Sequence, residues 1–194
     1  MLRPTPYGLI IVLLISFCGL SIADDRNGAI SSLKRFAASE HLEKGEAILG
    51  LVGFYGDPAP PQWLILTTFE EKPGILREAV FARGNVVAQR KFKVLPGQDL
   101  PHIPVQIEAL RIDSAKAFIV AERAAVEKKA AFDSVHYQLR CREAGQEPVW
   151  MLSLINSSQV AVGVVYISAV SGEVIRESWP LLQKEKFASP RSES

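Results

Sequence analysis

The sequence predicts an α+β fold in which one helix followed by an antiparallel meander of strands occurs twice, after a cleaved signal peptide. The main observation is that residues 61–88 and 148–175 have nearly the same layout, a tryptophan-bearing strand, a turn, a longer strand, and a glycine turn into a strand with valine near its start. The matching residues are Pro61 and Trp63, 87 positions before Pro148 and Trp150, and Gly84 and Val86, 88 positions before Gly172 and Val174. This ordered match favours an internal duplication over a chance likeness of turns and strands.

The N-terminal residues predict an export signal. Arg3 is the only charge before residue 24, residues 8–20 are apolar, and Ser21 and Ala23 occupy the small positions of a cleavage site, which predicts a signal peptide over 1–23. The apolar run is shorter than the roughly 17–25 residues of a membrane-spanning helix. A lipoprotein signal at Cys18 is disfavoured because Phe17 precedes it. We expect a periplasmic or secreted protein with no stable membrane anchor after cleavage.

Cleavage changes both the cysteine count and the charge. It removes Cys18 and leaves Cys141 alone, so no internal disulfide can form. It also removes Arg3 from the 22 basic residues, leaving 21 against 21 acidic residues. A chain with no net charge and no basic stripe argues against a nucleic-acid partner.

The first unit is predicted over residues 24–94. A helix from about Gly28 to His41 places Ile30, Leu33, Phe36 and Ala37 on one face. The prolines of residues 57–62 exclude a strand there, and Gly84-Asn85 fits a two-residue hairpin turn. The predicted strands are 47–56, 63–69, 75–83 and 86–94.

A proline-rich joint, residues 95–106, leads to the second unit, 107–182. Asp113 or Ser114 can cap its helix. The predicted apolar stripe of this helix is Ala117, Phe118, Ala121, Ala124, Ala125 and Phe132. The predicted strands are 134–142, 149–155, 159–170 and 174–179, and the polar tail, 183–194, is expected to fray.

The second unit resembles a PepSY-like domain. The resemblance covers about Ile112 to Trp179 and is carried by "IDSAKAFIVA", "VWMLSLI" and the closing "YISAVSGEVI". Ser171 stands where the family's ending usually has Thr, and Ala169 replaces the Asp before it. The first unit looks like a more divergent copy, with "FARGNVV" at the matching hairpin. Tandem units of this kind are also similar to the β-lactamase-inhibitor proteins. The resemblance implies a binding or inhibitory module and brings no catalytic residues.

The sequence holds few reactive groups in a catalytic or metal-binding arrangement. His41, His102 and His136 stand in no metal-binding spacing, and no nucleophile turn or phosphate-binding glycine loop occurs. Cys141 shares one side of its strand with Val135, Tyr137 and Leu139, which indicates a small buried residue. A nucleophilic Cys141 would need a basic partner such as His136. The sequence therefore predicts no enzyme, no catalytic residues, no metal and no cofactor.

Four residues are candidates for partner binding. Trp63 and Trp150 occupy equivalent strands, and core packing is their favoured interpretation; if they face outward, they form a recognition surface. Ile119 and Val126 lie off the main stripe of the second helix and would contact the other unit or a partner.

The function predicted from these observations is an exported, non-enzymatic module that binds a protein or peptide, as a protease inhibitor or a folding aid. The first alternative is a carrier of a small apolar ligand, with a pocket between helix and sheet lined by Phe36, Phe81 or Phe118. The second is an enzyme in which a cleft gathers Cys141, His136 and an acid. A purely structural envelope protein is a further alternative.

Overall fold

The computed structural model describes residues 28–97, 100–141, 143 and 146–180. The predicted signal peptide, including Cys18, and the predicted polar tail lie outside these residues. Within the described part of the chain, no helix has the length and apolar character needed to cross a membrane.

The first half of the chain forms one helix and four strands, as predicted. These are α1 (Ala29–Ala37), β1 (Glu46–Gly56), β2 (Trp63–Phe69), β3 (Ile75–Ala82) and β4 (Asn85–Lys93). A short 3-10 helix, η2 (Ile107–Ala109), follows the joint. The second half repeats the pattern with α2 (Ser114–Glu127), β5 (Ser134–Arg140), β6 (Val149–Ile155), β7 (Ala161–Ser168) and β8 (Val174–Ser178).

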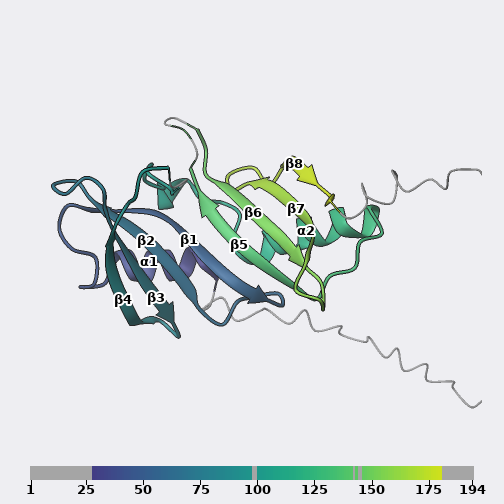
Figure 1. Cartoon of the computed structure of the whole chain (residues 1–194), viewed down its shortest axis with the longest axis horizontal. Coiled ribbons are helices and arrows are strands. Elements are labelled where there is room, and N and C mark those ends of the chain that lie inside the picture. The colour runs from purple at the N-terminus through teal and green to yellow at the C-terminus, as the bar shows by residue number, and fades with distance from the viewer. Residues whose placement is uncertain (1–27, 98–99, 142, 144–145, 181–194) are drawn as a thin grey trace, which may run out of the picture.

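All eight strands form one antiparallel sheet in the order β4-β3-β2-β1-β5-β6-β7-β8 (Figure 1). Both helices pack on the same side of this sheet, and their buried residues share one core cluster with it. The predicted α+β class of two helix-plus-meander sets is confirmed. What the sequence did not indicate is that β1 pairs with β5, which makes two meanders into a single sheet.

The junction between the two halves is built from aromatic rings. Trp63 and Trp150, the two repeat-related tryptophans, lie with ring centroids 6.5 Å apart, and Tyr137 packs on both at 5.8 and 6.2 Å. Gly53 of β1 pairs with Trp63 and with Tyr137, and a Cβ at Gly53 would collide with the Trp63 ring. The tryptophans are therefore core residues at the centre of the molecule.

The two helices are joined at their N-termini by Asp113. Its Oδ1 accepts hydrogen bonds from the N–H of Ser114, at 2.7 Å, and from the N–H of Ile30 in α1, at 3.1 Å. A Cβ at Gly28 would collide with the same carboxylate. Asp113 thus satisfies helix-terminal donors on both α1 and α2, groups that otherwise have no intrahelical partner.

Both helices end earlier than predicted. At α1, Ser39 donates from its backbone and its hydroxyl to the Phe36 carbonyl, so the helix stops at Ala37 and not near His41. At α2, Lys129 takes a left-handed φ of 55°, and Ala130 N–H donates to the Ala125 carbonyl. This pattern is that of a Schellman motif, in which Lys129 occupies the left-handed position where glycine is usually found.

Two further details correct the sequence prediction. Phe132 lies beyond α2, although it still packs on Phe118 with centroids 6.0 Å apart. The β3–β4 turn is centred on Arg83-Gly84 and not on Gly84-Asn85, because Ala82 pairs with Asn85. Arg83 and Gly84 have φ of 51° and 85°, as a type I′ hairpin turn requires.

An ion pair is buried beneath the end of α1. Arg77 donates to Glu46 at 2.7 and 2.5 Å, and their side chains are 3% and 0% exposed. Arg77 also donates to the His41 carbonyl and to Gln89, and its guanidinium lies 5.6 Å from the centroid of the Phe36 ring. These contacts attach the segment after α1 to the sheet.

We predict that Arg77→Met destabilises the fold by about 3–5 kcal/mol, because Glu46 would keep a buried carboxylate without its partner. Chemical denaturation followed by circular dichroism measures this change. Arg90→Met is the matched control, since Arg90 pairs with Glu78 at 3.0 Å while its side chain is 71% exposed. Equal losses in both variants would contradict the assignment of Arg77 as a core residue.

Candidate functional site: the open face of the sheet

The sheet has one covered face and one open face. Both α1 and α2 lie on the covered face (Figure 1). Trp63, Tyr137 and Trp150 point toward the helices, so their strand neighbours point the other way. Among the described elements, no helix packs on this second side, which we call the open face.

Apolar side chains run across the open face from one strand to the next. Cross-strand pairing places Leu64 beside Val52, and Val52 beside Gln138 of β5. The row continues in both directions, and its half-buried members in strand order are Val80, Leu64, Val52, Gln138, Met151 and Tyr166. Five of these six are apolar or aromatic, although an uncovered antiparallel face usually alternates to polar residues.

Phe54 and Tyr55 project from this face at an irregularity in β1. The pairing of β1 with β5 shifts between Gly53 and Gly56, so two residues bulge out of the ladder. Phe54 is 44% exposed and Tyr55 is 54% exposed. Tyr55 also holds a left-handed φ of 53°, an uncommon conformation for a residue with a side chain. We call this pair the aromatic bulge.

His136 lies next to the aromatic bulge, on the neighbouring strand. Its ring contacts Phe54 and Tyr55 edge to face, with centroids 5.2 and 4.5 Å away. The Nε2 atom of His136 is buried and has no hydrogen-bond partner. Burial lowers the pKa of this imidazole, because removal from water disfavours its charged form.

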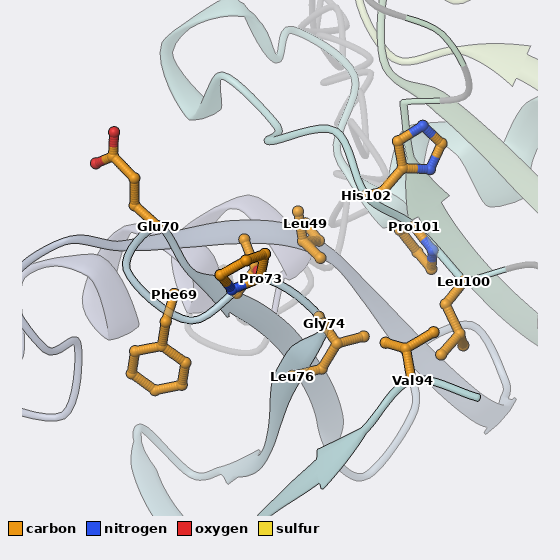
Figure 2. Close-up of a pocket in the computed structure, with 11 residues that line it drawn as sticks. Leu49, Phe69, Glu70, Pro73, Gly74, Leu76, Val94, Leu100, Pro101 and His102 are labelled. Carbon is orange, nitrogen blue, oxygen red and sulfur yellow. The ribbon is translucent and has the colours of Figure 1, made fainter. Parts of the chain in front are cut away.

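Two hollows lie on the open face of the first half. One, of about 210 Å³, is lined by Val52, Phe54, Leu64, Leu66 and Phe92 among others. The other, of about 470 Å³, lies between the β2–β3 turn and the joint (Figure 2). Leu100 and Pro101 of the joint line both hollows.

The larger hollow is apolar at its base and polar only at its edge. Leu49, Leu76, Val94 and Leu100 point toward one another, while the Glu70 carboxylate and the His102 ring point away from them (Figure 2). Leu49 sits where the pairing of β1 with β2 shifts, and it is fully buried outside the main core. The shift turns Leu49 to the open face.

Charged groups frame this surface. Arg90 and Glu78 form their exposed pair beside the smaller hollow, and Glu78 lines it. In the second half, Arg176 lies 5.7 Å from the centroid of the Tyr166 ring, beside a third hollow of about 350 Å³. An apolar centre with a charged rim is the usual composition of a protein interface.

The structure separates the four predicted partner-binding residues. Trp63 and Trp150 are 2% and 0% exposed, so the hypothesis that they form an exposed recognition surface is wrong; the junction of the two halves buries both rings. Ile119 and Val126 are 46% and 70% exposed on the outer side of α2, away from the open face. The first half does not cover them, and their role in partner binding stays a prediction.

In the described part of the chain, Cys141 and His136 are not brought together. Cys141 directly follows β5 and is 6% exposed in the core under the helices, whereas His136 of β5 faces the open side. Burial raises the pKa of the Cys141 thiol. Among the described residues, no three His, Cys, Asp or Glu side chains gather in a metal-binding group.

The aromatic bulge was not predicted from the sequence. Residues 53–56, "GFYG", were assigned to a regular strand, yet adjacent aromatics cannot both face the core of a pleated strand. Glycines on either side of such a pair are a signal for a bulge. His136 alternates with Val135 and Tyr137, which already placed it on the face opposite to the core.

Comparison with known proteins shows the fold and no more. No family model and no curated protein matches this chain, so the PepSY resemblance stays a prediction. A crystal structure of a putative lipoprotein from Clostridium difficile 630 is similar to the chain, with a TM-score of 0.52 at 10% sequence identity. The similarity covers 79% of this chain and 93% of that one.

We predict that Cys141 reacts slowly with iodoacetamide in the folded protein, because the thiol is buried and its pKa is raised. Mass spectrometry of the chain lacking residues 1–23 measures the rate, with the same chain in denaturant as the reference. A native rate equal to the unfolded rate would contradict the buried placement of Cys141.

Proposed function

We propose that this protein is an exported, non-enzymatic module that binds a segment of another protein or a peptide on its open face. The observation that carries the proposal is the aromatic bulge, where a strained backbone presents Phe54 and Tyr55 outward beside an apolar row. Strained conformations persist where the surrounding structure enforces them, and they concentrate at binding and active sites.

The size and chemistry of the surface favour a macromolecular partner. The apolar row crosses strands from both halves of the sheet, which is too long for one small molecule. Partner proteins bind through a few exposed aromatic anchors surrounded by weaker contacts. Phe54 and Tyr55 are such anchors, and the row from Val80 to Tyr166 supplies the surrounding contacts.

Export of the protein is supported by two observations. The N-terminal 23 residues have the composition of a signal peptide. The similar structure belongs to a protein described as a putative lipoprotein. Protease inhibition and assistance in folding are the two forms that binding would take.

The larger hollow favours a second candidate function, the carriage of a small apolar ligand. Its volume of about 470 Å³ lies in the range of ligand pockets, and its base is apolar. This hollow is on the open face. A pocket between helix and sheet, lined by Phe36, Phe81 or Phe118, was expected from the sequence. These rings pack on other rings instead: Phe36 on Phe81, with centroids 6.2 Å apart, and Phe118 on Phe132. A small molecule retained by the purified protein in native mass spectrometry would favour this function.

We predict that Phe54→Ser with Tyr55→Ser weakens partner binding at least about tenfold, because it removes both aromatic anchors. Affinity capture from the native exported fraction identifies the partner, and titration calorimetry with the purified partner measures the affinity. Circular dichroism confirms that the variant folds.

The matched control is Ile119→Ser with Val126→Ser, which removes two apolar residues of similar exposure from the outer side of α2. We expect this control to bind as the unsubstituted protein does. If the α2 variant loses the partner while the open-face variant keeps it, the binding surface lies on α2 and the present assignment is wrong.

A further inference from the structure

The contact between His136 and the aromatic bulge includes a buried polar side-chain atom without a hydrogen-bond partner, which is found nowhere else among the described residues. A buried polar atom without a hydrogen-bond partner is rare in folded proteins and calls for an explanation. Here the atom is Nε2 of His136, and the groups next to its ring are Phe54 and Tyr55, the two proposed anchors.

We propose that His136 acts as a pH switch for the aromatic bulge, holding Phe54 and Tyr55 in place while neutral and releasing them when protonated. The effect on partner binding rests on the proposed function of the open face. The movement of the bulge itself does not, and it can be observed in the isolated protein.

The described groups around His136 include no ion-pair partner for an imidazolium. From β1 it meets the rings of Phe54 and Tyr55, and Asp57 follows in the loop after β1. From β6 it faces Ser153, which cannot titrate. On its own strand, the nearest ionisable residue on the same face is Arg140, a like charge. No carboxylate of the described residues forms an ion pair with His136.

Protonation therefore puts a charge and an unpaired N–H among aromatic rings. The buried Nε2 can reach water only if the neighbouring rings move aside. The bulge is the element best able to move, because it has already left the β1–β5 ladder and Tyr55 holds a left-handed φ. The strands on either side remain paired through Gly53 and Gly56.

The direction of the pH effect follows from the sign of the pKa change. Histidine in open solution titrates near pH 6.5, and burial lowers the pKa of His136 below this value. The released state therefore binds more protons than the closed state as pH falls below about 6.5. The closed bulge is fully stable above this pH and loses stability as acid is added.

The test is a proton NMR titration of the chain lacking residues 1–23, between pH 8 and pH 4.5. The variant His41→Gln with His102→Gln leaves His136 as the single histidine. We expect its imidazole to titrate with a midpoint below 6.5, and the ring signals of Phe54 and Tyr55 to shift with the same midpoint. The His136→Phe variant should keep these ring signals constant over the same range.

A midpoint at or above 6.5, or Phe54 and Tyr55 signals that do not follow His136, would overturn the switch. Ring signals that move equally in His136→Phe would overturn it as well. The single-histidine variant decides the question even if His136→Phe does not fold. If the α2 control variant loses the partner and the open-face variant keeps it, the proposed function is wrong and the switch is unaffected.

Discussion

The contact between β1 and β5 is the interaction on which the rest of the structure depends. Trp63, Tyr137 and Trp150 pack beneath it, and Gly53 has no side chain because the Trp63 ring occupies that space. The Tyr137 hydroxyl donates to the Pro58 carbonyl and so attaches the loop after β1 to the second half. The tryptophans that revealed the internal repeat are thus the residues that join its copies. Without this junction, the sheet and its continuous open face would not exist.

The unequal faces of the sheet follow from the way the helices are held. Asp113 accepts from the N-termini of both helices, so α1 and α2 lie on the same side. The alanines of α2, Ala117, Ala121, Ala124 and Ala125, allow that helix to approach the strands closely. Both helices pack on one face, and the apolar row on the other face is left without a helix over it. The open face is a consequence of the shared helix anchor.

Local structure could be predicted well from the sequence because turn-forming residues precede several of the strands. Prolines before Trp63 and Trp150 and glycines before the closing strands indicated where the turns occur, and β2 and β6 begin and end at the predicted residues. The pairing of β1 with β5 could not be predicted, since no pattern of residues indicates which edge strands of two meanders pair with each other. Lys129 takes a left-handed conformation without glycine, so local composition did not indicate the end of α2. The candidate site depends on that pairing and on the bulge, so none of Trp63, Trp150, Ile119 and Val126, the four candidates named from the sequence, lies in it.

The position of β1 at the centre of the sheet has a consequence for each half as a separate polypeptide. A chain cut at the joint would leave β1, the longest strand, with one row of backbone N–H and C=O groups unpaired. The outer strand β4 has Arg90, Lys91 and Lys93 to discourage further pairing, but the inner edge of β1 carries no such charges. Two identical halves could then pair through β1 and β1, with the same antiparallel direction that β1 and β5 use now. The present molecule has the form of such a homodimer fused into a single chain, in which each copy is free to acquire different side chains on the open face.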